Sequence, residues 1–266
     1  MKKIFCILFI SMIALAFTKK LKSFIPPGTV QINDTLFADN SEVTNFSWQE
    51  YEYWTKTIYG SNSKEHLASL PDTTCWREKL SNNEPYVKYY YRHIAYRNFP
   101  VVGISHEQAN AFCKWRTNRV KTLLTIKKDF NHQNFEFRLP SKTEWEMLAE
   151  TSTMFLLNNG KDEKGNYQLN CIYIIDSARV LKYDFKSRVD VTNPVKTYHK
   201  NRFGLYNMLG NVAEMVSEKG ISKGGSWRNR IEECRVGKEL EYTKANAWVG
   251  FRCVCVIKNK SPYIKS

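Results

Sequence analysis

The order in which helix-forming and strand-forming patterns occur constrains the fold of this chain more than any other feature. Apolar residues recur every three or four positions after Ser47, Ser105 and Ser141, and each serine is followed three residues later by Glu or Gln, as in a capping box. From about residue 160, Gly, Asn and short β-like runs replace this pattern, with strands expected at 221–227 and 249–257. Early helices followed by late strands predict a mixed α+β domain rather than a βαβ repeat.

The start of the chain predicts export. Lys2 and Lys3 precede an apolar stretch at 4–17 that contains Ala14-Leu15-Ala16, an A-x-A cleavage pattern. We therefore expect a signal peptide at 1–16 and a mature protein in the periplasm, at the cell surface or secreted. An uncleaved membrane anchor is the alternative. With no internal repeat or long linker, 17–266 is expected to form one domain, opening with a strand pair at 29–37.

Charge and hydropathy restrict the partners. The chain has 40 Lys and Arg against 26 Asp and Glu, a net charge of +14. These basic residues are scattered, which predicts a solvated basic surface and no nucleic-acid partner, while peripheral membrane association stays open. No apolar run reaches the roughly 20 residues of a spanning helix, so a polytopic membrane protein is excluded.

Cysteine usage agrees with an oxidising compartment. Six of the seven cysteines follow the predicted signal peptide, an even number that permits disulfides without selecting their pairing. There is no C-x-x-C pair, and the histidines lack zinc-site spacing, so a locally encoded zinc site is not expected. The six are Cys75, Cys113, Cys171, Cys234, Cys253 and Cys255.

Several phrases together resemble the formylglycine-generating enzyme, or sulfatase-modifying factor, family. They are PVVGIS (100–105), AxxFCxW (109–115), RLPSxxEWE (138–146), FGLYNMxGNV (203–212), GGSW (224–227) and GFRC (250–253), in the family's order. The resemblance implies a compact, C-type-lectin-like α+β fold with little regular secondary structure. The stretches 90–100 and 115–120 are most similar to gliding-motility-associated and type IX secretion lipoproteins of the Bacteroidetes, which implies a protein partner at the cell envelope.

The resemblance also implies a copper site that this chain has lost in part. Catalytic members of the family bind copper(I) through two cysteines that follow the aromatic residue of the GGS-aromatic phrase, and those positions are Asn229 and Cys234 here. Asparagine offers a hard oxygen where copper(I) prefers a thiolate. Ala213 replaces a second family aromatic, so Ser226 and Cys234 are interpreted as vestigial, and copper is not expected unless a remote cysteine substitutes.

Calcium is the cofactor that the resemblance favours. The family phrase places four oxygen donors within eight residues, on Asn207, the carbonyls of Gly210 and Val212, and Glu214, and calcium prefers such donors. The alternative is that Asn207 caps a turn and Glu214 is solvated. A weaker second calcium site would use Asn170, the Cys171 carbonyl and Asp184.

The resemblance further implies a disulfide between Cys113 and Cys253, with Cys255 as the rival partner. Three functions follow as hypotheses. The leading one is an exported, non-catalytic or repurposed structural or interaction module of the cell envelope. The others are a metal-dependent oxidoreductase of the formylglycine-generating type acting on a peptide cysteine, and a calcium-dependent carbohydrate-binding surface, which rests on fold analogy alone.

Overall fold

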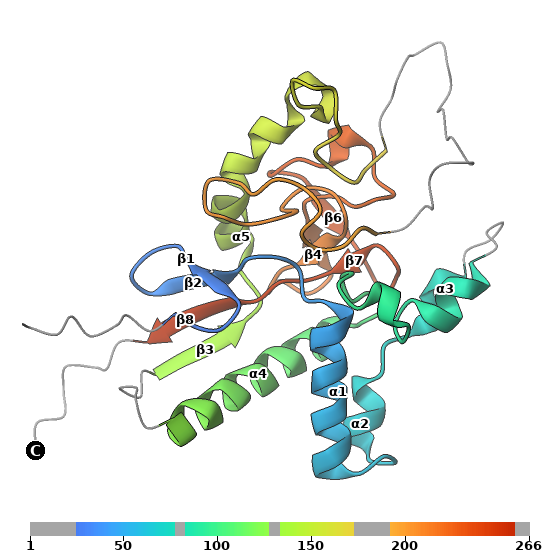
Figure 1. Cartoon of the computed structure of the whole chain (residues 1–266), viewed down its shortest axis with the longest axis vertical. Coiled ribbons are helices and arrows are strands. Elements are labelled where there is room, and N and C mark those ends of the chain that lie inside the picture. Colours follow the sequence, from blue (N-terminus) through green and yellow to red (C-terminus); the bar gives the residue numbers. More distant parts are fainter. Residues whose placement is uncertain (1–24, 78–82, 128–133, 173–191, 259–266) are drawn as a thin grey trace, which may run out of the picture.

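The computed structural model describes residues 25–77, 83–127, 134–172 and 192–258, and these form an α+β fold (Figure 1). The strands are short, from two to five residues. The helices are α1 (Asn45–Tyr59), α2 (Lys64–Ser69), α3 (Glu84–Tyr89), α4 (His106–Lys127) and α5 (Lys142–Ala149), with 3-10 turns η1 (Thr73–Trp76), η2 (Ile94–Tyr96), η3 (Glu150–Gly160) and η4 (Ile231–Glu233).

Two small sheets organise the described residues. In the first, the expected hairpin of β1 and β2 is extended by β8 and then β3, all antiparallel, and α4 packs below β3 (Figure 1). In the second, the order is β6-β5-β4-β7, and β4 and β7 run parallel. The strands are β1 (Thr29–Gln31), β2 (Leu36–Asp39), β3 (Asn134–Arg138), β4 (Ala213–Met215), β5 (Ile221–Lys223), β6 (Glu239–Glu241), β7 (Val249–Gly250) and β8 (Val254–Lys258).

Two of the three predicted helix caps are confirmed. The Ser141 hydroxyl accepts from the Glu144 backbone N–H, and the Glu144 carboxylate accepts from the Ser141 N–H. Ser105 and Gln108 exchange the same two bonds before α4. The prediction for Ser47 is wrong because Thr44, three residues earlier, caps α1 and accepts from the Ser47 N–H at 3.1 Å. Both hydroxyls suit a cap, and local sequence does not rank them.

The two late strand predictions are wrong in extent. The strand expected at 221–227 ends at Lys223, since Gly224 and Gly225 take left-handed φ values of 91° and 72°. The strand expected at 249–257 is divided between β7 in one sheet and β8 in the other. Cys253 therefore lies outside a strand, in the crossing between the two sheets.

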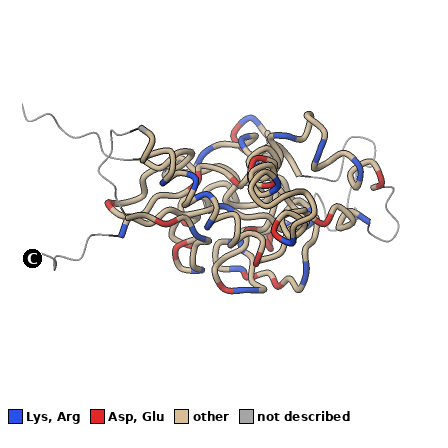
Figure 2. The backbone as a smooth tube through the Cα atoms, turned by 90° about the horizontal axis from the view of Figure 1, so that it is seen from below, with Lys and Arg blue, Asp and Glu red and all other residues tan. Residues whose placement is uncertain are grey.

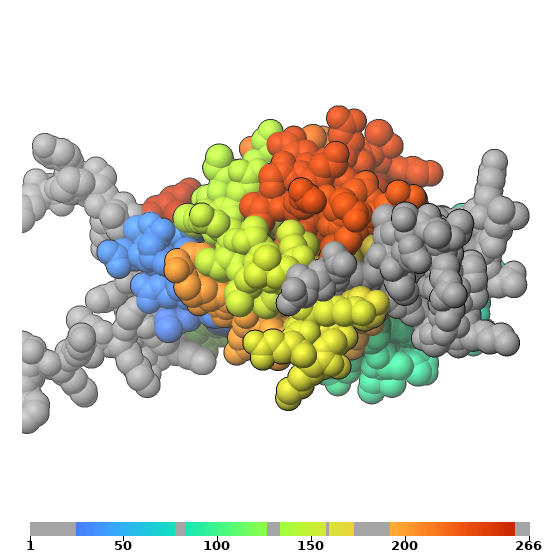
Figure 3. All heavy atoms as spheres, turned by 90° about the horizontal axis from the view of Figure 1, so that it is seen from above, coloured from blue at the N-terminus to red at the C-terminus, as the bar shows by residue number. Residues whose placement is uncertain are grey.

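An aromatic core joins the early helices to that crossing. Trp48 of α1 stacks on Phe112 of α4 with ring centroids 5.4 Å apart, and Phe251 meets both rings edge-on. On the other side of the first sheet, α5 and the late glycine-rich segments lie side by side and share one face (Figures 1 and 3). The segments after residue 200 thus lie between α5 on one side and α1 and α4 on the other, and they bring together residues that are far apart in the sequence (Figure 1).

The surface agrees with the scattered charge of the sequence. Lys and Arg positions are distributed along the whole tube rather than on one face (Figure 2). In the part of the chain that the structure describes, no helix combines the length and apolarity needed to cross a membrane.

Candidate functional site

The first part of the candidate site is the carboxylate of Glu214 on β4, which is buried and bound on both oxygens. Arg252 donates from Nε to Oε2 at 2.7 Å and from Nη2 to Oε1 at 2.5 Å, and the Trp145 indole N–H donates to Oε2 at 2.8 Å. Glu214 and Arg252 have no exposed area. The alternative of a solvated Glu214 is therefore wrong, and the carboxylate is already neutralised by a guanidinium.

Asn207 and Asn211 place a second carboxylate, that of Glu42, beside this pair. Both asparagines lie in left-handed backbone, with φ values of 49° and 60°. The Asn207 Nδ2 donates to both Glu42 oxygens at 3.2 and 3.3 Å, and the Asn211 Nδ2 donates to Oε1 at 2.7 Å. Glu42 lies 165 residues before Asn207 and outside every family phrase, so no local pattern predicts its role.

In the cluster around these residues the carboxylates outnumber the guanidinium groups by one. Among the described residues it holds the carboxylates of Asp39, Glu42 and Glu214 and the guanidinium groups of Arg116 and Arg252. Burial raises the pKa of the Glu42 carboxyl to about 8; Arg252 opposes this shift and Glu214 adds to it. Either a proton on Glu42 or a bound cation can therefore balance the cluster.

The predicted calcium ligands fit a cation in part. Among the described residues the buried Asn207 Oδ1 has no hydrogen-bond partner, so it can accept a metal. The amide now faces Glu42 with its nitrogen, so a cation shared with Glu42 requires the amide to turn over. Gly210 approaches Asn170 so closely that a Cβ would lie 2.8 Å from its carbonyl oxygen. Glu214 fits poorly because both of its oxygens already accept from Arg252 or Trp145. A calcium ion here would take its charged ligand from Glu42.

The second predicted calcium set is only partly described. The Asn170 carbonyl accepts from the Asn211 N–H at 2.8 Å, and its side-chain amide donates to the Asn211 Oδ1 at 3.3 Å. Asn170 and Cys171 therefore lie against the first set. Asp184 lies outside the described residues.

The residues of the copper phrase form a different kind of site. The Ser226 hydroxyl donates to the Asn229 Oδ1 at 2.5 Å, so this amide is already engaged. Cys234 is fully buried, and its thiol is in hydrogen-bond contact with Cys171. This contact and burial raise the pKa of the Cys234 thiol well above its usual value. The two positions of the phrase thus supply no exposed thiolate pair, and copper(I) does not fit them.

The structure brings the predicted disulfide partners together. The Cys113 and Cys253 sulfurs are buried and 3.5 Å apart, a contact between thiols. Burial, followed by the Cys113 thiol, raises the pKa of Cys253 well above its usual value. Cys255, the rival partner, pairs across the sheet with Phe37 and Phe137. The disulfide itself stays a prediction.

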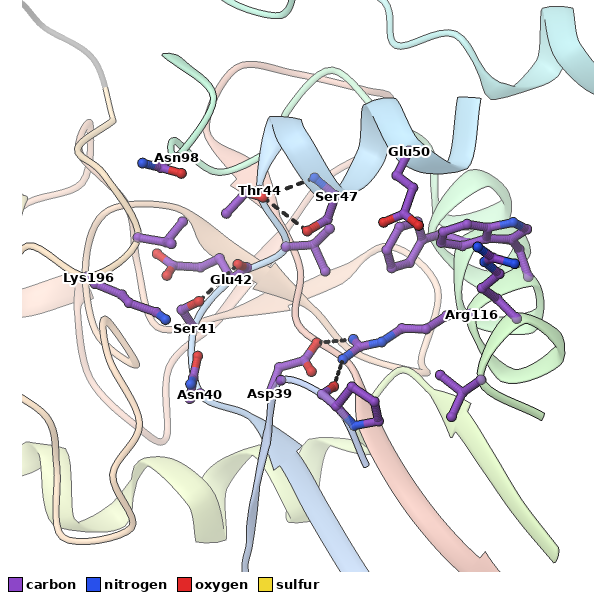
Figure 4. A pocket seen from close by; sticks show the side chains of 18 of the residues that line it. Asp39, Asn40, Ser41, Glu42, Thr44, Ser47, Glu50, Asn98, Arg116 and Lys196 are labelled. Atoms are coloured by element: carbon purple, nitrogen blue, oxygen red, sulfur yellow. Dashed lines mark hydrogen bonds and ion pairs between the residues drawn. The ribbon is translucent and has the colours of Figure 1, made fainter. Parts of the chain in front are cut away.

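A pocket of about 690 Å³ opens beside the buried cluster, between the segment before α1, α4 and residues 194–196. Figure 4 shows the Asp39–Arg116 ion pair, 2.7 Å long, on one side and Glu42, Ser41 and Lys196 on the other. Apolar side chains complete its wall. They are Val43, Phe112, Trp115, Val120, Leu123 and Val195.

Comparisons with known proteins agree with this architecture. Two solved structures share the fold: CarF, 20% identical with a TM-score of 0.51, and PvdO from Pseudomonas aeruginosa, 18% identical with a TM-score of 0.50. The CarF match covers 84% of this chain and 87% of CarF, and the PvdO match covers 84% and 80%. A search of curated protein sequences finds no match. At these identities the structural likeness defines a fold class, the compact α+β fold of formylglycine-generating enzymes.

The family follows from the sequence profile. The Sulfatase-modifying factor enzyme 1-like domain matches residues 13–257, which is most of the chain. The protein belongs to this family, as the phrases that surround Asn207, Ser226 and Arg252 predicted.

Proposed function

We propose that this protein is an exported member of the sulfatase-modifying factor family that binds a protein partner at the cell envelope and has lost the oxidase chemistry. The observation that carries the proposal is the state of Cys234. Its thiol is fully buried against Cys171, while Asn229 at the other copper position is hydrogen-bonded to Ser226. A peptide cysteine needs access to an activating metal, and these residues offer none.

The role of calcium in this proposal is structural. The Glu42 carboxylate and the Asn207 amide lie next to each other, with the amide nitrogen facing Glu42. If this amide turns over, one calcium ion can balance the Glu42 charge and coordinate the Asn207 oxygen, which has no hydrogen-bond partner among the described residues. Bound there, the ion would hold the segment before α1 against the 207–214 segment. In this proposal the ion stabilises the wall of the pocket and takes part in no reaction.

The pocket beside Glu42 is the proposed partner site. It combines an apolar wall with side chains of both charges, which suits a protein segment that presents an apolar side chain flanked by polar groups. The charged side chains are Asp39, Glu42, Glu50, Arg116, Arg119 and Lys196. A photo-cross-linking residue placed at Lys196 should capture a partner in envelope preparations. The same residue at the exposed Lys238, outside the pocket, should not. A gliding or type IX secretion assembly is the setting that the sequence resemblance suggests.

Export is tested separately. Replacing Ala14 and Ala16 by bulky residues should block maturation, since signal peptidase requires small side chains at these positions. N-terminal sequencing of the wild-type protein recovered from the envelope shows at which residue the mature chain begins. A wild-type protein that still begins at Met1 would contradict the cleavage.

The oxidase is tested by copper titration. The wild-type protein should not compete for copper(I) with a chelator of high affinity, and it should not consume oxygen in the presence of a cysteinyl peptide. Asn229→Cys restores the second thiol of the phrase and serves as the matched variant. Stoichiometric copper and oxygen consumption by the wild type would overturn the proposal.

A second candidate function has one observation in its favour. Cys171, although remote in sequence, lies beside Cys234 and could act as the missing copper ligand. The protein would then remain a metal-dependent oxidoreductase. The same titration on Cys171→Ser distinguishes this case, because copper binding by the wild type would be lost in that variant.

A further inference from the structure

Cys171 and Cys234, whose pairing the sequence alone does not fix, lie together beside the turn at Gly224 and Gly225. Cys171 and Cys234 have no exposed area and belong to one cluster of buried side chains together with Trp145 and Met208. The Cys234 thiol is in side-chain hydrogen-bond contact with Cys171. The pair therefore lies in the interior, away from solvent.

The backbone holds the two cysteines in register. Ile172, next to Cys171, forms a parallel bridge with Arg230. Its N–H donates to the Asn229 carbonyl at 2.8 Å, and its carbonyl accepts from the Ile231 N–H at 3.0 Å. The single 3-10 turn η4 then returns the chain to this bridge, with the Cys234 N–H donating to the Ile231 carbonyl at 3.1 Å.

Gly225 completes the enclosure of the Cys234 sulfur. A Cβ at position 225 would lie 2.5 Å from that sulfur and 2.9 Å from the Cys234 Cα. The sulfur therefore packs directly on backbone and has little freedom to turn away from Cys171. Three independent features, the bridge, the turn and the glycine contact, thus fix the two thiols against each other.

We propose that Cys171 and Cys234 form a disulfide bond in the exported protein. Each thiol loses a proton and together they lose two electrons as the sulfur–sulfur bond forms. A disulfide-bearing thiol oxidant accepts both electrons and both protons and leaves as two thiols. The inference uses the export of the proposed function, but it does not depend on a partner or on calcium.

The bond forms during folding, before the core closes. In the folded protein neither sulfur is exposed, and the raised pKa of the Cys234 thiol keeps the reactive thiolate scarce. Once formed, the bond joins the segment that carries Cys171 to the loop that carries Ser226 and Asn229. A Cys234 sulfur in a disulfide cannot bind a metal as a thiolate, so this copper position serves as a structural cross-link instead.

Mass spectrometry of the wild-type protein decides the proposal. Protein exported through an oxidising compartment is denatured with iodoacetamide, without reductant, and digested with trypsin. The expected product is the peptide 165–179, which contains Cys171, bonded to the peptide 231–235, which contains Cys234. Full alkylation of Cys171 and Cys234, or a bond from either cysteine to Cys75, would overturn the proposal.

Thermal unfolding of the full-length protein adds a second readout. Reductant should lower the wild-type melting temperature by about 5–15 °C more than it lowers that of the Cys171→Ser/Cys234→Ser variant. Cys255→Ser is the matched control, because it also replaces a buried thiol and should keep the wild-type response to reductant. An equal response in the double variant and the wild type would contradict the bond. If the double variant does not fold, the wild-type peptide map still gives the answer.

The outcomes separate this inference from the proposed function. Two thiols that bind no copper would refute the disulfide and leave the binding module standing. Two thiols that bind copper(I) and support oxygen consumption would refute both. A disulfide with no partner captured at the pocket would uphold the inference and count against the proposed function.

Discussion

The Glu214 site and the Cys234 site derive from neighbouring family phrases, yet they depart from the family in opposite ways. At Glu214 all four expected residues of the phrase are present, but the carboxylate is held by Arg252 and Trp145. At Cys234 one expected residue is missing, but Cys171 lies beside the remaining thiol. In both sites the deciding partner comes from elsewhere in the chain. A complete phrase therefore does not define the chemistry, and an incomplete one does not exclude it.

Electrostatics separates the two sites further. The Glu214 site contains buried charges whose balance depends on Arg252 and on the protonation of Glu42. In the Cys234 site the buried side chains of Cys171, Ser226 and Cys234 are neutral, and the nearby charge, Glu233, is half-buried. Its energy comes mainly from packing and from hydrogen bonds such as that of Ser226. Changes of charge should thus destabilise the first site strongly and the second weakly.

The largest effect is expected when the guanidinium is removed. Arg252→Met leaves Glu214 and Glu42 buried without their shared cation, so the free energy of unfolding should fall by about 3–5 kcal/mol. Urea denaturation measures it. Adding Glu214→Gln to this variant should recover much of the loss. Lys258→Met, which removes an exposed ion pair with Glu136, is the control and should cost less than about 1 kcal/mol. A similar cost for both single variants would contradict the buried-charge account.

These sites also show where sequence reasoning succeeds and where it ends. The caps at Ser105 and Ser141 are local, so spacing alone reveals them. The ligand phrase from Asn207 to Glu214 comes from the family resemblance, and calcium binding there stays a prediction. The α+β class follows from periodicity, and the family follows from phrases in order. The two helix caps, the fold class and the family were thus predictable without a structure.

Contacts between distant segments were not predictable in this way. Glu42 meets Asn207 across 165 residues, and Arg252 reaches Glu214 because the 249–257 segment leaves one sheet and enters the other. No periodicity encodes such a crossing. The choice of Thr44 over Ser47 as the cap of α1 was missed for a related reason, since the segment preceding α1 is positioned by its bridge to Pro100.

The protonation of Glu42 predicts the next largest effect, in calcium-free protein kept in chelator. Its pKa of about 8 in the folded state exceeds the value of 4.5 expected when unfolded. The folded state therefore binds the extra proton between these values, and the stabilisation present below pH 4.5 is lost as pH rises towards 8. Wild type should lose a few kcal/mol across this range by urea denaturation.

The variant Glu42→Gln isolates this effect. Glutamine keeps the shape and cannot ionise, so the slope of stability between pH 5 and pH 8 should become shallower. Glu218→Gln, at a half-buried carboxylate that accepts from Ser217, should retain the wild-type slope. Parallel slopes for all three proteins would show that Glu42 does not titrate in this range.

Calcium binding should change the free energy of unfolding by a somewhat smaller amount, and this change distinguishes Glu42 from Glu214 as the charged ligand. At a concentration of about 100 times its dissociation constant, calcium should stabilise the wild type by about 2.7 kcal/mol and raise its melting temperature. Glu42→Gln should remove most of this shift because it removes the charged ligand. Glu218→Gln should keep it.

The response of Glu214→Gln then assigns the ligand. A retained calcium shift in this variant, despite a lower starting stability, would establish Glu42 as the charged ligand. A shift lost in Glu214→Gln but kept in Glu42→Gln would assign the charge to Glu214, as the family phrase implies. Absence of any shift in the wild type would refute the calcium site.

The smallest effect compares the same substitution at two indoles, Trp145 in the Glu214 site and Trp227, which follows Ser226 in the chain but packs in a separate cluster with Trp76 and Tyr90. The Trp145 indole donates to the charged Glu214 carboxylate at 2.8 Å, and the Trp227 indole donates to the neutral Ala247 carbonyl at 3.0 Å. Replacing either by Phe removes one hydrogen bond and part of a ring. Trp145→Phe should cost about 2–3 kcal/mol and Trp227→Phe about 1 kcal/mol, because a hydrogen bond to a charge is the stronger.

A second background separates the hydrogen bond from packing, since Trp145 is also the more deeply buried ring. In Glu214→Gln the acceptor is neutral, so the cost of Trp145→Phe should fall by about 1 kcal/mol while that of Trp227→Phe stays unchanged. Urea denaturation of the four proteins in each cycle gives both coupling energies. If Trp145→Phe costs the same in both backgrounds, its contribution is packing alone, and the charge of Glu214 interacts with Arg252 but not measurably with the indole.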